Sequence, residues 1–170
     1  RLAAALRARG VARGDRVALV LPQRFETAVA HVALYRLGAV AMPLSMLFGP
    51  DALEYRIRDS EARLAIVDES GIANVRAARS LCPGLATVVA VGAAAGQGDV
   101  DWAELVRGAP SSFVAEPTSA DDPAVLIYTS GTTGPPKGAL QAHRLVIGNL
   151  SGFVHSHDFF PQAGDIFWSP

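Results

Sequence analysis

The sequence predicts an α/β fold in which a mainly parallel sheet carries helices on both faces. Short, continuous apolar runs recur between residues 17 and 91, and segments with a helical spacing of apolar residues separate them. Such runs are typical of strands buried on both faces, and their alternation with helices indicates βαβ units. Right-handed crossovers then distribute the helices over both faces of the sheet.

The individual elements follow from the apolar runs and from glycine and proline stops. Strands are predicted over 17–21, 39–44, 64–67, 86–91 and 124–128, and helices over 1–10, 24–37, 70–81 and 101–107. A further helix opens at Gly49-Pro50-Asp51. Gly10 and Gly38 are expected to end their helices, because glycine tolerates the left-handed backbone found there. In 24–37 the apolar residues at helical spacing are Phe25, Ala28, Val29, Val32 and Ala33. Residues 92–98 are expected to form a loop, and 109–122 a surface connection.

Composition excludes several classes of protein. The net charge is −1 and the charges are scattered, which argues against a nucleic-acid partner. The sequence contains no run of about 18 apolar residues, so no membrane span is expected. Cys82 is the only cysteine. It is interpreted as a small buried hydrophobic residue in a reducing compartment, so a cytoplasmic location is expected.

A glycine-rich, hydroxyl-rich turn follows the strand predicted over 124–128, and its composition suits a polyphosphate. Its glycines permit positive φ and close backbone approach, its hydroxyls donate hydrogen bonds, and Lys137 adds a compact positive charge. With few internal partners for these donors, 129–138 is predicted to be a mobile loop. The candidate binding residues are Thr129, Ser130, Gly131, Thr132, Thr133, Gly134, Pro135, Pro136 and Lys137, followed by Gly138.

Two observations sharpen this hypothesis. The turn is not a Walker A loop, because that pattern needs G-x-x-x-x-G-K-[ST], whereas Pro136 precedes and Gly138 follows the lysine. The chain also has 14 arginines and one lysine among its 15 basic residues. If arginine has replaced lysine at every position where it can perform the same role, the remaining lysine marks a position where arginine cannot.

The run from Tyr128 to Gly138 closely resembles the signature of the adenylate-forming (AMP-binding) superfamily. That superfamily includes acyl-CoA synthetases, adenylation domains of peptide synthetases and firefly-type luciferases. A second segment, residues 34–44, is similar to the family pattern L-x-x-G-A-x-x-x-P-L. The resemblance implies that the whole chain is part of the large amino-terminal domain of such an enzyme. It divides into an α/β unit (1–108), a connection (109–122), and the phosphate-loop motif with a following helix (123–170).

The resemblance implies a reaction in which a carboxylate attacks the α-phosphate of ATP and pyrophosphate leaves. The acyl-adenylate then passes to a thiol such as that of coenzyme A. Residues 129–137 would hold the β- and γ-phosphates, and Mg²⁺ would share their charge, with no metal ligand assigned in this chain. The adenine, ribose and catalytic-lysine segments of the family lie beyond Pro170. The 170 residues alone are therefore expected to be inactive, with no catalytic residue among them.

Three functions stay open at this point. Residues 157–160 and 164–170 resemble the corresponding segments of synthetases for short, medium-chain or aromatic acids. This resemblance favours an acid–CoA ligase, whose partners would be ATP, coenzyme A and a small carboxylic acid. The alternative is an adenylation domain that loads an amino or aryl acid onto a carrier protein. A non-catalytic structural or interaction piece is the third. Both ends look cut, so a longer protein is expected, and a homodimer is one option for its assembly.

The remaining polar and aromatic groups have structural interpretations, and some have a functional interpretation as well. His143-Arg144 either faces the nucleotide or begins a helix that continues through Leu150. His155 and His157 either bind a metal or end that helix. The pairs Asp68-Glu69 and Asp121-Asp122 are interpreted as solvated loop ends. Four aromatic residues either pack in the core or line the acyl pocket: Phe159, Phe160, Phe167 and Trp168.

Overall fold

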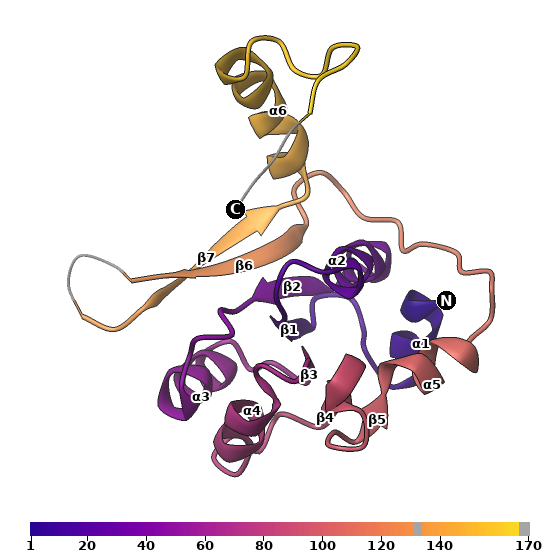
Figure 1. The fold of residues 1–170 in the computed structure, drawn as a ribbon, viewed down its shortest axis with the longest axis vertical. Coiled ribbons are helices and arrows are strands. Elements are labelled where there is room, and N and C mark those ends of the chain that lie inside the picture. The colour runs from indigo at the N-terminus through magenta and orange to yellow at the C-terminus, as the bar shows by residue number, and fades with distance from the viewer. Residues whose placement is uncertain (131–133, 167–170) are drawn as a thin grey trace.

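The computed structural model describes residues 1–130 and 134–166. Within these residues the strands form one seven-stranded sheet in the order β5-β4-β3-β1-β2-β6-β7 (Figure 1). Every neighbouring pair is parallel except β6 and β7, so the predicted mainly parallel sheet is confirmed. The strands are β1 (Arg16–Val20), β2 (Val40–Pro43), β3 (Leu64–Val67), β4 (Thr87–Ala90), β5 (Val100–Asp101), β6 (Pro123–Thr129) and β7 (Lys137–Ala142).

Helices cover both faces of the sheet, as the sequence predicts. On one face α1 (Leu2–Ala8) packs on α2 (Phe25–Leu37) and α5 (Trp102–Arg107), and on the other α3 (Pro50–Asp59) packs on α4 (Ile72–Arg79). Successive strand residues alternate between these layers, because side chains of a strand point to opposite faces. In β1, Val17 and Leu19 belong to the first core, and Ala18 and Val20 to the second. This double burial explains the continuous apolar runs.

The helix ends follow the glycine signals. Gly10 and Gly38 both have positive φ at the ends of α1 and α2. The apolar pattern predicted over 24–37 marks a helix, but it marks the buried face only in part, through Val29 and Ala33. Phe25 is 79% exposed and Val32 57% exposed, whereas Ala30 and Leu34 are fully buried. The small residue at position 30 lets α2 lie close against the sheet, a packing detail that spacing alone does not reveal.

Three elements differ from the expectation. The loop predicted over 92–98 begins with a single 3₁₀ turn, η1 (Gly92–Ala94), and the two-residue strand β5 follows it. Strand β7 takes in the last two residues of the loop predicted over 129–138 and continues through 139–142, where no element was predicted. Strand β6 was expected to be buried on both faces, yet Ile127 is 40% exposed beside buried Leu126. It therefore has one exposed face in this structure.

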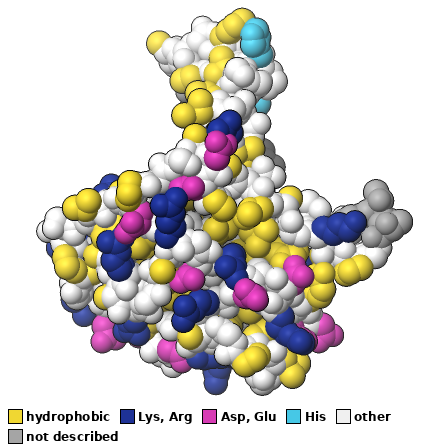
Figure 2. All heavy atoms as spheres, turned by 180° about the vertical axis from the view of Figure 1, so that it is seen from behind, with side chains coloured by type: hydrophobic (Ala, Val, Ile, Leu, Met, Phe, Trp, Pro, Cys, Tyr) yellow, Lys and Arg dark blue, Asp and Glu magenta, His cyan; other side chains and the backbone are white. Residues whose placement is uncertain are grey.

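Helix α6 (Arg144–Ser156) stands away from the sheet, beyond the base of the β6–β7 hairpin (Figure 1). Its exposed apolar side chains include Ile147 and Leu150. On the face drawn in Figure 2, basic and acidic side chains are interspersed over the body, and hydrophobic ones gather toward the hairpin and α6. No helix in 1–130 or 134–166 is long and apolar enough to cross a membrane. Cys82 is buried, as predicted, and burial raises the pKa of its thiol.

Candidate functional site

The candidate phosphate loop is the turn of a β-hairpin. Strands β6 and β7 pair antiparallel, with Tyr128 opposite Gly138 and Thr129 opposite Lys137. The expectation of a loop over 129–138 is therefore too wide, because its two ends belong to the ladder of the hairpin. The predicted mobility of its central residues, Gly131, Thr132 and Thr133, concerns positions outside the described residues.

The remaining predicted residues lie on an exposed surface at the end of the hairpin. Thr129 and Ser130 are exposed, and so are Gly134, Pro135 and Lys137. Gly134 has φ +84°, which an L side chain rarely adopts. Within the described part of the chain, the Lys137 ammonium makes no hydrogen bond or ion pair. The arrangement offers hydroxyl donors and one uncommitted cation to an anionic ligand.

Gly138 has a different role from the one expected of it. It has no positive φ, and a Cβ at this position would lie 2.9 Å from Leu126 Cδ1 and 3.4 Å from Tyr128 Cζ. Both contacts come from the paired strand β6. Glycine at this position therefore leaves room for the cross-strand packing of Leu126, with the Tyr128 ring next to it.

A face of α3 contacts the hairpin, and the sequence reasoning missed it. The Tyr55 hydroxyl donates a hydrogen bond to the carbonyl oxygen of Pro136 at 3.0 Å. The Tyr128 hydroxyl donates to Asp59 Oδ2 at 2.5 Å. Tyr55 and Asp59 are four residues apart, so they share one face of the helix. That spacing is visible in the sequence, but only the sheet order shows that this face meets β6.

Arg56 fills the space between the same helix and the hairpin. It is 7% exposed, its Nη1 donates to the Ala52 carbonyl at 2.7 Å, and no ion pair of it occurs among the described residues. Its guanidinium lies 4.1 Å from the ring centre of Phe48 and 5.7 Å from that of Tyr128. The ring faces stabilise the buried cation. Burial, followed by the contact with Asp59, raises the pKa of the Tyr128 phenol, which therefore stays a donor at neutral pH.

Three of the histidines lie at the two ends of α6. His143 occupies the N-cap position of α6 without a side-chain capping bond, and Arg144 pairs with Asp121, so the prediction that a helix begins at this pair is confirmed. His143 stands at the opposite end of β7 from Lys137, roughly 20 Å away along a strand of this length. His155 and His157 lie at the end of α6. No cluster of three metal-ligating side chains occurs among residues 1–130 and 134–166.

The aromatic residues after α6 are only partly described. Phe160 packs edge-on against Phe153 at 5.9 Å, which is packing within the α6 region. Phe159 is 59% exposed and lies 5.0 Å from the His155 ring. Phe167 and Trp168, which were considered for the acyl pocket, are outside the described residues.

The interpretation of Asp68-Glu69 as a solvated loop end is wrong for Asp68. This carboxylate is 2% exposed, and it accepts hydrogen bonds from Ser70 and from Arg24 Nη1. Arg24 also pairs with Glu26, which lowers the pKa of that carboxyl. The cluster lies where β1 and β3 end, the point at which many α/β folds bind ligands. Here internal ion pairs occupy it.

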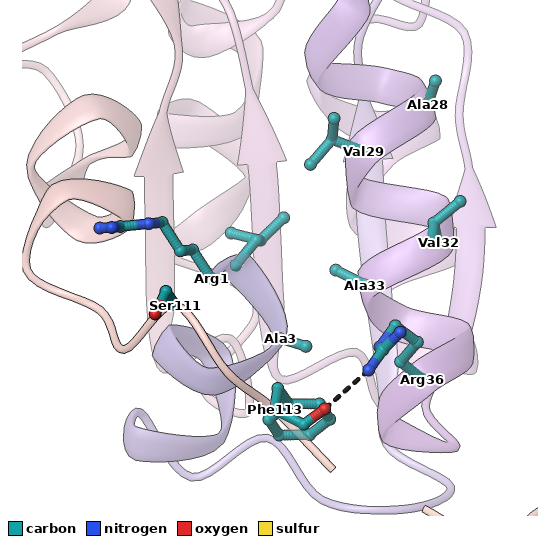
Figure 3. Close-up of a pocket in the computed structure, with 10 residues that line it drawn as sticks. Arg1, Ala3, Ala28, Val29, Val32, Ala33, Arg36, Ser111 and Phe113 are labelled. Carbon is teal, nitrogen blue, oxygen red and sulfur yellow. Dashed lines mark hydrogen bonds between the residues drawn. The ribbon is translucent and has the colours of Figure 1, made fainter. Parts of the chain in front are cut away.

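The apolar hollow in Figure 3 is separate from the candidate site. Its volume is about 460 Å³, and α1, α2 and residues 111–113 line it. Arg36 closes one side by donating to the Phe113 carbonyl at 2.6 Å (Figure 3). It lies against the α1–α2 layer, whereas the hairpin contacts α3 on the other face of the sheet. Its lining is mostly apolar, and its two arginines, Arg1 and Arg36, donate to backbone carbonyls.

The fold is that of the adenylate-forming family. The family model of the AMP-binding enzyme matches residues 1–170, and the chain belongs to this family. It is 36% identical over 187 aligned residues to acetyl-coenzyme A synthetase 2 of Pseudomonas aeruginosa, an alignment that covers 99% of this chain and 28% of that protein. It is also 37% identical to acetyl-coenzyme A synthetase of Halorhodospira halophila, again over 99% and 28% of the two chains.

Solved structures agree with this assignment. The crystal structure of the anthranilate CoA ligase AuaEII with anthranoyl-AMP superposes with a TM-score of 0.84 at 29% identity, covering 88% of this chain and 29% of that one. Apo MatB from Rhodopseudomonas palustris superposes with a TM-score of 0.74 at 30% identity, covering 92% and 30%. The chain thus spans less than a third of the length of these relatives.

Proposed function

We propose that the full-length protein is an ATP-dependent acid–CoA ligase that works through an acyl-adenylate. The observation that carries the proposal is the end of the β6–β7 hairpin, where Thr129 and Ser130 present hydroxyls, Gly134 has a positive φ and Lys137 is uncommitted. In a chain of the AMP-binding family, such a turn is suited to the triphosphate of ATP. This role of the turn and the activity of the longer protein are both proposals.

The chemistry requires stabilisation of a leaving group. A carboxylate oxygen forms a bond to the α-phosphorus of ATP while the bond from that phosphorus to the bridging oxygen breaks, and pyrophosphate carries away the electron pair. Negative charge therefore grows on the β- and γ-phosphates. Donors already fixed in place stabilise this charge without reorganisation. Lys137 would supply the positive charge, and Thr129 and Ser130 would supply hydroxyl donors.

We expect Mg²⁺ to enter the site as a companion of ATP. Mg²⁺ prefers an octahedral shell of oxygens and often keeps waters and substrate phosphates as ligands. The described residues offer no cluster of three acidic or metal-ligating groups to cage it. No step of the proposal therefore depends on a metal ligand within these 170 residues.

Two features favour a CoA ligase over the carrier-protein alternative. The named relatives are acetyl-coenzyme A synthetases, and AuaEII is named an anthranilate CoA ligase. Acetate and small aromatic acids are accordingly the first substrates to test. A non-catalytic role is the remaining alternative, and no feature of the described residues specifically favours it.

Pyrophosphate exchange by the full-length protein tests the proposal. Labelled pyrophosphate should enter ATP in the presence of acetate or another small acid, and added coenzyme A should give the thioester. Exchange with an amino or aryl acid and no thioester would favour the carrier-protein alternative. Absence of exchange across a panel of carboxylic acids, with folded protein, would contradict the proposal.

The 170 residues by themselves should not complete the reaction. They contain the turn proposed for the phosphates, while the family resemblance assigns the adenine, ribose and catalytic-lysine segments to later parts of the chain. A pyrophosphate-release assay on residues 1–170 should give the rate of the buffer blank. Turnover that persists after purification to homogeneity would place the active site elsewhere than argued above.

A further inference from the structure

The outer half of the β6–β7 hairpin extends past the strand that supports it. Parallel pairing sets Ala41 of β2 against Val125 of β6. Because parallel strands advance in step, Pro43 at the end of β2 lies level with Ile127. Tyr128, Thr129 and the paired start of β7 therefore continue beyond β2. A two-stranded hairpin is marginal without further support.

Helix α3 supplies that support from a fixed position. Its Leu53 and Ile57 are buried to 0% and 1% exposure in the core beneath the sheet, and it packs along α4. The same helix carries Tyr55 and Asp59 on the side that meets the hairpin. The Tyr55 and Tyr128 rings meet edge to face at 6.4 Å. The hairpin thus rests on an element whose own place is set by the core.

The contact at Pro136 acts on the residue that follows it. The proline ring already fixes φ at that position. The hydrogen bond from Tyr55 to the Pro136 carbonyl fixes the other side of the residue, because it orients the peptide plane that joins Pro136 to Lys137. With both restraints in place, the position of the Lys137 Cα is fixed relative to α3.

We propose that Tyr55 is a positioning residue for phosphate binding, and that it acts through Pro136 on Lys137. The inference rests on the proposed role of the hairpin turn in binding ATP phosphates. In this proposal Tyr55 does not contact the substrate itself. Asp59 and Arg56 also hold the hairpin against α3, because both contact Tyr128, the strand partner of Gly138.

Tyr55→Phe in the full-length protein tests the proposal, because it removes the hydroxyl and keeps the ring. Loss of one hydrogen bond should slow adenylation about 2- to 10-fold and raise the KM for ATP, with the KM for the acid unchanged. Thioester formation from a supplied acyl-adenylate and coenzyme A should keep its wild-type rate, because that half-reaction involves no pyrophosphate. A variant that is merely less stable would lose both half-reactions.

The matched control is Tyr35→Phe. Tyr35 also lies in a helix and bonds through its hydroxyl, in this case with His31 Nδ1 at 3.0 Å on the same helix. This substitution should leave both half-reactions unchanged. In a Lys137→Ala background, Tyr55→Phe should add little to the loss of adenylation, since residues that act through each other are not additive. Full additivity would overturn the proposed route through Lys137.

Amide hydrogen exchange separates this inference from the proposed function. Tyr55→Phe should speed exchange in 137–142 several-fold and leave 64–67 in the core unchanged, and this readout needs no turnover. Unchanged exchange together with wild-type adenylation would overturn the positioning role. A wild-type protein without pyrophosphate exchange would instead overturn the proposed function, and the role of Tyr55 in phosphate binding with it.

Discussion

The Tyr128 hydroxyl on β6 donates a hydrogen bond to Asp59 Oδ2 on α3, at 2.5 Å and across 69 positions of sequence. The bond joins the last turn of a core helix to the strand that leads into the candidate phosphate loop. It couples the stability of the hairpin to the α/β body, because moving either partner away from the other breaks the bond. The first two predictions concern this contact.

Removing the phenol should loosen the hairpin without unfolding the sheet. Tyr128→Phe keeps the ring over Gly138 and deletes the donor, and Asp59 is exposed enough for water to replace it. The free energy of unfolding should therefore fall by about 1 kcal/mol. Urea denaturation should show a lower midpoint with the same slope. Asp59→Asn, which keeps an acceptor oxygen, should cost less than Tyr128→Phe, and the reverse order would contradict the assignment.

The same contact predicts a dependence on alkaline pH. The folded pKa of Tyr128 is raised above its ordinary value of 10.0, first by burial and then by Asp59. A raised pKa means that the stabilisation is complete below about pH 10 and is lost as the pH rises through the folded pKa. The difference in unfolding free energy between wild type and Tyr128→Phe should be constant from about pH 7 to about pH 9. Above about pH 10 it should shrink.

Lys137 should matter for adenylation and little for folding. A charge-assisted hydrogen bond contributes about 1.5–3 kcal/mol, so Lys137→Ala should slow adenylation roughly 10- to 150-fold. Lys137→Arg should restore only part of the rate, because a planar guanidinium does not replace a compact ammonium. Thermal unfolding should be unchanged in both, since the side chain is exposed. Wild-type adenylation by Lys137→Ala would remove this lysine from the phosphate site.

Two glycine substitutions should have opposite effects. Gly138→Ala places a methyl group 2.9 Å from Leu126 Cδ1 and should destabilise the protein by about 1 kcal/mol or more. Gly148→Ala lies inside α6, where a Cβ meets nothing within 4 Å. It should stabilise that helix by about 0.5–1 kcal/mol, because alanine loses less backbone entropy. Thermal unfolding of wild type and the two variants checks this: the unfolding temperature should fall for Gly138→Ala and rise for Gly148→Ala.

The strands that are buried on both faces could be predicted from the sequence because burial leaves an unbroken apolar run. Strand β7 could not. Its sequence, KGALQA, has no β-branched or aromatic residue, and its conformation depends on pairing with β6. The exposed face of β6 could not be predicted either, because the exposure of Ile127 depends on which elements pack against the strand. From its residue type alone, Ile127 is typical of a core position.

The candidate turn was found from residue types that carry chemistry, but the groups that support it were not. Tyr55 and Asp59 are ordinary helix residues in the sequence. Their relation to Tyr128 and Pro136 depends on β6 joining the sheet beside β2, so that α3 lies near the hairpin. Order within a sheet is a long-range property, and local periodicity carries no information about it.

The place of β2 in the sheet also has a consequence for synthesis on the ribosome. One edge of β2 pairs with β1, and the other edge waits for β6, whose first residue is Pro123. At about 5–20 residues per second, the chain from Pro43 to Pro123 takes roughly 4 to 16 s to be made. During that interval the unpaired backbone N–H and C=O groups along the free edge of Val40, Ala41 and Met42 can pair with another nascent chain. We therefore expect the nascent chain to be most prone to aggregation just before β6 emerges.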